Sequence, residues 1–168
     1  MIETERLLIK PLTYDNLIKY LKNDNSLEVE LCLNPSSRTI SSELKDALEN
    51  TILPNVANTN KNYLFTTLWT IVLKSENIMV GDICIVDEPN QQGEIEIGYG
   101  TYEKFQSKGY MTEAVNGIIE WAKTQPNVKS IIASTSNENA ASYKVLIKNN
   151  FEKIGESEGL INWKLLIK

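Results

Sequence analysis

The stretch 94–122 constrains the fold more than any other part of the chain. Residues Glu94–Tyr99 alternate between polar and apolar side chains, as in a half-buried strand, until Gly98 breaks the alternation. Further on, apolar residues recur at three- and four-residue spacing, as on one face of a helix: Met111, Ala114, Val115, Ile118, Ile119 and Ala122. The pattern therefore predicts a strand, a short loop at Gln106–Met111 and an amphipathic helix.

The loop of this unit has the features of an anion-binding site. A helix start leaves main-chain N–H groups without partners at the positive end of the helix dipole, and such groups bind phosphate well. Lys104 and Lys108 flank the loop and add positive charge. From this segment alone two interpretations stay open: a site for phosphate or pyrophosphate, or an ordinary connection in which Gly109 permits a tight turn.

Length and composition favour one globular domain spanning residues 1–168. The chain has 168 residues, 42% of them hydrophobic and 23% charged, and it contains no repeat or Pro/Gly-rich linker. No apolar run approaches the roughly 20 residues that a membrane-spanning helix needs, and the first residues do not resemble a secretory signal. Cys32 and Cys84 form no C-x-x-C pair. We therefore expect a cytoplasmic protein without a membrane partner.

The chain contains no histidine, which excludes several kinds of active site. Ser-His-Asp and Cys-His hydrolysis need that residue, as do His-rich zinc and iron sites. Two separate cysteines cannot form a thiolate metal site. We therefore expect no bound metal, and proton transfer by carboxylates, Tyr, Lys, Ser or water. The net charge of −5 argues against a nucleic-acid partner and suits a cationic or amine substrate.

The order of the expected elements places the chain in the α+β class, with a mixed, largely antiparallel sheet flanked by helices. The expected helices cover residues 14–22, 41–52, 111–124 and 140–148, and the expected strands cover 6–10, 68–73, 78–86, 94–99, 129–134, 151–155 and 160–167. Pro54 is expected to end the second helix. Residues 25–40 fit a strand and a helical turn equally well.

Three segments together resemble the GNAT superfamily of N-acetyltransferases, and within it the branch of the ribosomal-protein-alanine acetyltransferases. Thr4–Leu12 is similar to the T-x-R-L-x-L start of that branch. Glu96–Tyr99 followed by Gln106–Ala114 resembles its strand-loop-helix motif for acetyl-CoA. Asn139–Ser142, continuing to Lys148–Phe151, resembles its N-x-x-S…K-x-G-F segment. The resemblance spans essentially the whole chain.

The resemblance implies a GNAT fold in which two central strands splay apart and form a cleft for acetyl-CoA, the acyl-donor cosubstrate. It implies that the enzyme moves an acetyl group to a primary amine, on a protein N-terminus or a small molecule, by direct attack of the amine on the thioester. The residues implied to bind the cofactor are Ile97, Gly98, Tyr99, Gln106, Ser107, Lys108, Gly109, Tyr110, Met111, Asn139 and Ser142. Gly98 is expected to form a bulge that opens the cleft.

The chain departs from the family pattern at three positions. Met111 stands where Gly or Ala is usual, and its place in the apolar stripe of the helix favours a core side chain over contact with the cofactor. Asn150 replaces a Gly before Phe151, an exchange compatible with a left-handed backbone. Leu146 replaces a Tyr that protonates the leaving thiolate in many family members, which leaves the general acid open.

Three residues are the candidates for catalysis. Glu96 is the first choice as general base and Glu94 the second, because both share the strand face of Gly98. The alternative is that they are exposed strand carboxylates. Ser142 contacts the thiol sulfur or relays a proton according to the resemblance, or else is simply a small residue on a helix face.

A second function stays open beside acetyl transfer: a catalytically silent acyl-CoA-binding module with a regulatory role. The two functions differ in one observable, because the silent module would bind coenzyme A without releasing thiol in the presence of amines. Lys144 and Lys148 either meet a phosphate of the cofactor or lie on a solvated helix face. A monomer and a homodimer are both compatible with the sequence.

Overall fold

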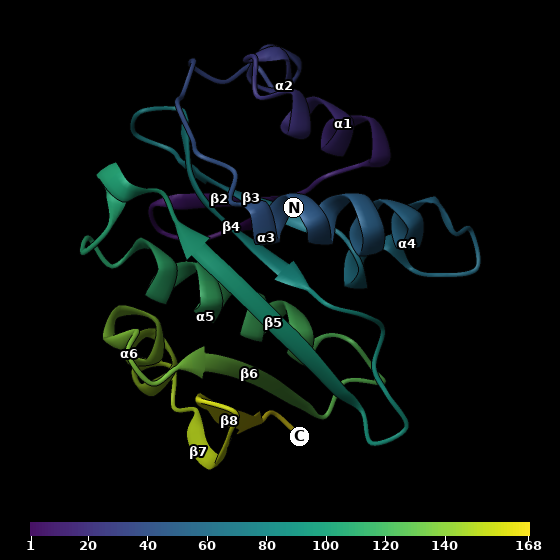
Figure 1. The fold of residues 1–168 in the computed structure, drawn as a ribbon, viewed down its shortest axis with the longest axis vertical. Coiled ribbons are helices and arrows are strands. Elements are labelled where there is room, and N and C mark those ends of the chain that lie inside the picture. Colours follow the sequence, from purple (N-terminus) through teal and green to yellow (C-terminus); the bar gives the residue numbers. More distant parts are fainter.

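The computed structural model describes residues 1–168, which form one eight-stranded sheet with helices on both faces (Figure 1). In space the strands follow the order β1-β2-β3-β4-β5-β6-β8-β7. Their bounds are β1 Ile2–Glu3, β2 Leu7–Pro11, β3 Leu68–Leu73, β4 Ile78–Ile85, β5 Glu94–Thr101, β6 Ser130–Ser136, β7 Glu152–Ser157 and β8 Leu160–Leu166. All neighbours are antiparallel except β5 and β6, which run parallel. The α+β class with a largely antiparallel sheet is confirmed.

The helices lie where the apolar periodicity places them, with additions in the first half of the chain. Their bounds are α1 Tyr14–Lys22, α2 Ser26–Glu30, α3 Ser42–Ala47, α4 Leu53–Ala57, α5 Tyr110–Lys123 and α6 Ala140–Lys148. A π-helix, η1, covers Leu48–Ile52, and 3₁₀ turns cover η2 Tyr63–Phe65 and η3 Glu103–Phe105. None of these helices combines the length and apolar character that crossing a bilayer requires.

Side-chain caps fix the starts of three helices. The Thr13 hydroxyl accepts the Asn16 N–H at 3.2 Å, while the Asn16 side chain accepts the Thr13 N–H at 3.1 Å. Ser41 caps α3 and Asn139 caps α6 through a single side-chain oxygen each. Because each cap satisfies a donor that the helix leaves free, it stabilises its helix by about 1 kcal/mol.

The helical segment that follows Ser41 is longer than the sequence predicts. α3 passes into η1 and then into α4, which ends at Ala57. The prediction that Pro54 ends the helix is wrong, because Pro54 occupies the first turn of α4, where its missing N–H costs no helical hydrogen bond. The π-helical turn before it changes the hydrogen-bond spacing, so that a new α-helical turn begins at Leu53.

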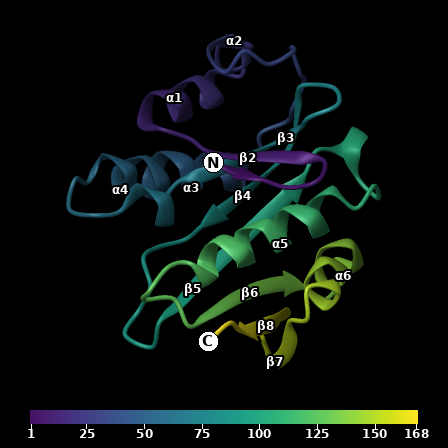
Figure 2. The same ribbon diagram turned by 180° about the vertical axis from the view of Figure 1, so that it is seen from behind.

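The two faces of the sheet pack against different helices and form two cores. Side chains along β3 alternate between them: Trp69 and Ile71 join the core under α5, whereas Leu68 and Val72 join the core under α1 and the α3–α4 segment. Figure 2 shows α5 crossing its face of the sheet, and Figure 1 shows α3 and α4 on the opposite face. This arrangement leaves the end of β5 between two layers of helices.

Candidate functional site

β5 and β6 pair at one end only. Glu94–Glu96 lie opposite Ser130–Ile132, and beyond this point β5 pairs with β4 alone while β6 pairs with β8 alone. Figure 1 shows the two strands diverging from their paired ends. The free edge of a strand presents main-chain N–H and C=O groups that an added extended chain can bind.

Gly98 lies in the diverging half of β5 but forms no bulge. The register between β4 and β5 runs without a shift from Ile97 to Thr101, so the predicted bulge is wrong. Beyond Glu96, β6 stays paired with β8 and β5 stays paired with β4, while the facing edges of β5 and β6 are left unpaired. The separation begins where the parallel pairing stops, at Glu96.

Tyr99 directs its main-chain N–H and C=O toward the opening. In an antiparallel pair, alternate residues bond to the partner strand. The Val86 N–H bonds the Glu96 carbonyl at 2.9 Å, and the Tyr102 N–H bonds the Val80 carbonyl at 2.9 Å, so the even-numbered residues of β5 face β4. The odd-numbered Tyr99 therefore faces the diverging side, where no strand pairs with it.

The loop between β5 and α5 presents a series of free donors. Its main chain is left-handed at Ser107, with φ of 63°, and at Gly109, with φ of 79°. The main-chain N–H groups of residues 107–112 donate no hydrogen bond to another protein atom. They gather at the N-terminal end of α5, a helix of 14 residues. Free N–H groups at the positive end of a helix dipole form the usual surroundings of a bound phosphate.

Arg6 holds this loop against the start of β2. Its guanidinium donates to the Lys108 carbonyl at 3.0 Å, pairs with Glu113 at 2.6 Å, and lies 4.8 Å from the centre of the Tyr110 ring. The Thr4 hydroxyl donates to the same Glu113 carboxylate at 2.6 Å. The N-terminal segment therefore fixes both the loop and the first turn of α5.

A cavity of about 550 Å³, the loop cavity, lies between this loop, the end of β5 and α6. Three lysines line it, Lys108, Lys144 and Lys148, and no acidic residue does. Although the whole chain carries a net charge of −5, this cavity is therefore positive. Such a local field attracts an anionic ligand.

Most of the residues that the sequence singles out for cofactor binding meet in the loop cavity. They are Tyr99, Gln106–Met111, Asn139 and Ser142. Two others lie elsewhere. The Ile97 side chain is buried in the core under α5, and Gly98 faces the opposite side of the sheet, where it lines a second cavity.

Ser142 connects α6 to β5. The Tyr99 hydroxyl donates to the main-chain carbonyl of Ser142 at 2.8 Å, and the Ser142 N–H donates to the Asn139 side chain at 3.1 Å. Burial raises the pKa of Tyr99 to about 12, against the lowering effect of its hydrogen bond, so the phenol stays protonated at neutral pH. The main chain of Ser142 is thus fixed, while its hydroxyl makes no hydrogen bond within the protein.

The three departures from the family pattern have structural explanations. Met111 is 6% exposed and packs in the core under α5, as its place in the apolar stripe predicts, although it also forms part of the cavity wall. Leu146 is fully buried in the same core. Asn150 adopts φ of 65°, the left-handed conformation that Asn tolerates better than most residues.

The two carboxylates predicted as bases line neither cavity. Glu94 pairs with Lys164 on β8, and the hydrogen bond from that lysine lowers the pKa of Glu94. Glu96 is half-buried at the last pairing position between β5 and β6. Their part in proton transfer stays a prediction.

The second cavity, which we call the Asp82 cavity, adjoins the loop cavity at the end of β5. It has a volume of about 520 Å³ and lies between α1, the segment before α3, and the strands β4 and β5. The residues common to the two cavities are Tyr99, Gly100, Thr101 and Phe105. Ligands in the two cavities would therefore meet at this end of β5.

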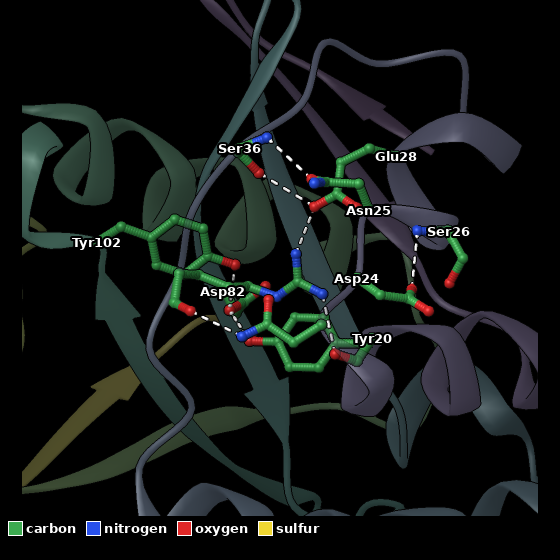
Figure 3. Close-up of polar contacts among 10 residues, drawn as sticks. Tyr20, Asp24, Asn25, Ser26, Glu28, Ser36, Asp82 and Tyr102 are labelled. Atoms are coloured by element: carbon green, nitrogen blue, oxygen red, sulfur yellow. Dashed lines mark hydrogen bonds and ion pairs between the residues drawn. The ribbon is translucent and has the colours of Figure 1, made fainter.

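Asp82 lies on β4 directly opposite Gly100 and is 6% exposed. Its Oδ2 accepts hydrogen bonds from the hydroxyls of Tyr20 at 2.6 Å and Tyr102 at 2.8 Å (Figure 3). Asp82 is not among the site residues predicted from the sequence, because it lies within residues 78–86, whose apolar content predicts a buried strand. The available signal was a lone acidic side chain within that strand, since unpaired carboxylates are rarely buried.

Comparison with known proteins identifies the family. The model of the acetyltransferase (GNAT) domain matches residues 6–152. The uncharacterized N-acetyltransferase YjdG of Bacillus subtilis is 28% identical over 168 residues, which cover 100% of this chain and 99% of the relative. YnaD, an uncharacterized N-acetyltransferase of the same organism, is 31% identical over 85 residues, or 51% of this chain and 49% of the relative.

Solved structures share the fold over almost the full length. A ribosomal-protein-S5-alanine acetyltransferase from Vibrio fischeri superposes with a TM-score of 0.68 at 20% identity, covering 99% of this chain and 96% of that one. The ribosomal L7/L12 α-N-protein acetyltransferase RimL, solved with coenzyme A, gives 0.67 at 15% identity over 97% and 95% of the two chains. The family model spans most of the sequence, and the chain belongs to the GNAT family of N-acetyltransferases.

Proposed function

We propose that the protein transfers the acetyl group of acetyl-CoA to a primary amine, on a protein N-terminus or a small molecule. The observation that carries this proposal is the meeting, in the loop cavity, of the free edge of β5 with the free N–H groups of residues 107–112. The free edge of β5 suits an extended, amide-containing arm, and the free N–H groups suit a pyrophosphate. A ligand with both parts joined fits the cavity as a whole.

The loop binds the pyrophosphate. Residues 107–112 offer donors that no protein atom uses, and Lys108 adds a charge beside them. Lys144 and Lys148, one helical turn apart on α6, face the same cavity and take the remaining phosphate. Arg6 acts indirectly, since its contacts with Lys108 and Glu113 keep the loop in its left-handed course.

The arm of the cosubstrate lies along β5. Tyr99 offers it the N–H and C=O that a neighbouring strand would otherwise bond, as in β-strand addition. The side chain of Asn139 lines the same wall and offers a further polar contact. This placement brings the thioester end of the arm to the part of β5 where the loop cavity meets the Asp82 cavity.

Acetyl-CoA supplies the activated acyl group, and the protein orients it and manages the protons. Ser142 lines the loop cavity with a hydroxyl that no protein atom occupies. That hydroxyl relays a proton to the leaving thiolate in place of the tyrosine that Leu146 replaces. Glu96 is the base that the sequence favours, although it lies outside both cavities.

Two measurements on the purified protein test the proposal. Calorimetry with acetyl-CoA should give saturable binding, and an assay of thiol release should respond to at least one primary amine in a panel of peptides with free N-termini, polyamines and small amines. Binding without amine-dependent thiol release would instead support the silent acyl-CoA-binding module. Absence of binding would contradict both functions.

A further inference from the structure

The Asp82 cavity borders on a buried charge cluster that lacks one cation. Glu28 is 1% exposed, and Arg38 and Asp82 are each 6% exposed. Arg38 pairs with Glu28 and donates to the Tyr20 carbonyl at 2.9 Å. The charge of Arg38 is therefore matched by Glu28, and an ionised Asp82 leaves the cluster with a net negative charge. A buried charge of this kind is costly unless a partner of opposite sign reaches it.

Asp82 also has an oxygen without a partner. Tyr20 and Tyr102 both donate to Oδ2, whereas Oδ1 is buried and accepts no hydrogen bond. Buried polar atoms are almost always hydrogen-bonded, so an orphaned carboxylate oxygen in a cavity wall calls for a donor from a ligand. The Thr70 hydroxyl, opposite Asp82 on β3, is also buried without a partner and can supply a neutral donor, but only a cation balances the charge of the cluster.

The strand opposite Asp82 leaves space for such a ligand. Gly98 and Gly100 occupy the β5 positions opposite Cys84 and Asp82, and residues opposite each other project to the same face of a sheet. A Cβ atom built on Gly100 would meet no atom within 4 Å. The volume beside the carboxylate is therefore open, and it continues into the loop cavity.

We propose that the Asp82 cavity receives the acceptor, and that Asp82 binds its primary ammonium group and takes up one of its protons. The inference rests on the proposed function, because it places the amine nitrogen beside the end of β5 at which the thioester would lie. It assigns proton uptake to a residue on β4 rather than to Glu96 on β5.

The groups that face Asp82 suit this role. Burial raises its pKa to about 6, against the lowering effects of Tyr20, Tyr102, the charge of Arg38 and the Thr70 hydroxyl. Burial also raises the pKa of both tyrosines, so they remain donors at neutral pH. A carboxyl group with this pKa is ionised at neutral pH and still basic enough to accept a proton.

The other neighbours do not neutralise the carboxylate. Thr70 lies opposite it on β3 and is uncharged. Burial raises the pKa of Cys84, two residues along β4, so this thiol stays neutral. Glu103 and Lys104 also line the cavity; both side chains are exposed, and their charges are opposite in sign.

The proton balance of the reaction closes with these groups. The bound ammonium gives one proton to Asp82 and becomes a neutral amine. Its lone pair attacks the thioester carbonyl, a C–N bond forms, the C–S bond breaks, and the sulfur leaves as a thiolate. The second surplus proton of the nitrogen passes to that thiolate. The products are an amide, a thiol and a protonated Asp82, which returns its proton to solvent.

Asp82→Asn tests the inference through binding as well as turnover. Three primary amines serve as probes: a peptide with an N-terminal alanine, spermidine and phenethylamine. Each is titrated by calorimetry into the complex of the protein with coenzyme A, which cannot react. We expect Asp82→Asn to weaken the amine that binds wild type best by at least 10-fold, the scale of a lost hydrogen bond to a charged group. Acetyl-CoA affinity should stay within 2-fold. Asp87→Asn, outside both cavities, is the matched control.

The outcomes separate the inference from the proposed function. Amine binding that depends on Asp82, but without acetyl transfer, would refute the function and keep the acceptor site. Transfer with equal amine affinity in wild type and Asp82→Asn would keep the function and refute the site. A failure of wild type to bind any of the three amines would also refute the site.

Two further variants guard against a folding defect in Asp82→Asn. Gly100→Val fills the open volume from the opposite strand and should weaken the amine by a similar factor. Tyr102→Phe removes a hydrogen bond that lowers the pKa of Asp82, so the acidic limb of kcat/KM should move to higher pH. If the acidic limb does not move in Tyr102→Phe, Asp82 has no role in proton uptake. The same conclusion follows if the limb disappears in Glu96→Gln but persists in Asp82→Asn.

Discussion

Arg6 Nε lies 2.6 Å from a carboxylate oxygen of Glu113, although 107 positions separate the two residues in the chain. The same carboxylate accepts the main-chain N–H of Arg6 at 2.8 Å and the hydroxyl of Thr4 at 2.6 Å. The N-terminal segment and the first turn of α5 are thus joined directly beside the loop that presents the free donors. This contact gives the Thr4–Leu12 motif a physical role in a site that it does not line.

Loss of this contact should weaken cofactor binding from a distance. Glu113→Gln keeps the shape of the side chain but removes the charge that pairs with Arg6. Because partly exposed pairs contribute about 1 kcal/mol or less, we expect acetyl-CoA affinity to fall by up to about 5-fold in calorimetry. Glu120→Gln, which alters an ion pair with Lys123 farther along α5, is the control and should change nothing. Equal effects of the two variants would contradict a role of the Arg6 contact.

Negative charge in the loop should abolish cofactor binding. Gly109→Asp puts a carboxylate among the free N–H groups that we assign to the pyrophosphate, at a residue with φ of 79°. Gly109→Asn carries the same backbone strain without the charge and should bind more tightly than Gly109→Asp by at least 10-fold. Gly159→Asp, at a left-handed glycine with open space around it, controls for stability. Unchanged affinity in Gly109→Asp would refute the assignment of the loop.

Removal of the Ser142 hydroxyl should slow the chemical step alone. The main-chain contacts of Ser142 with Tyr99 and Asn139 persist in Ser142→Ala. We therefore expect an unchanged dissociation constant for acetyl-CoA and a kcat lower by roughly 100-fold or more, the range of lost general acid–base catalysis. A wild-type kcat would return Ser142 to a purely structural role in α6.

Asp82 should make the protein less stable as the pH rises. The pKa of Asp82 is about 6 in the folded protein against 3.8 for an ordinary aspartate, so the folded state holds the extra proton between these values. The stabilisation from that proton is present below pH 4 and is lost as pH rises through 6. It amounts to about 3 kcal/mol. Urea titrations from pH 4 to 7.5 should show this effect directly. Over that range the free energy of unfolding of wild type should fall by about this amount relative to that of Asp82→Asn. A pH-independent difference would contradict the raised pKa.

The sequence predicted those elements whose residue pattern is local. α1 and α6 have the predicted bounds because apolar spacing and the caps at Thr13 and Asn139 agree. The continuation past Pro54 was missed because a π-helical turn leaves no distinct residue pattern. β1 was missed because two residues are too short to show a strand pattern of their own, and only their pairing with β2 defines them as a strand.

The site was predictable to the extent that it lies in one continuous stretch. The loop at 106–111 follows from the strand and helix around it. The divergence of β5 from β6 does not, because the point at which their pairing stops depends on strands that are distant in the sequence. The cluster around Asp82 assembles α1, the segment before α3, β4 and the end of β5. No spacing along the chain reveals that Tyr20 and Tyr102 meet at one carboxylate.

A crystal structure of the protein with coenzyme A tests the central claim most directly. We predict pyrophosphate oxygens within hydrogen-bonding distance of main-chain nitrogens of residues 107–112, and a pantetheine arm bonded to the N–H and C=O of Tyr99 in the opening between β5 and β6. Coenzyme A bound outside the loop cavity, or β5 and β6 paired along their whole length in that structure, would contradict it.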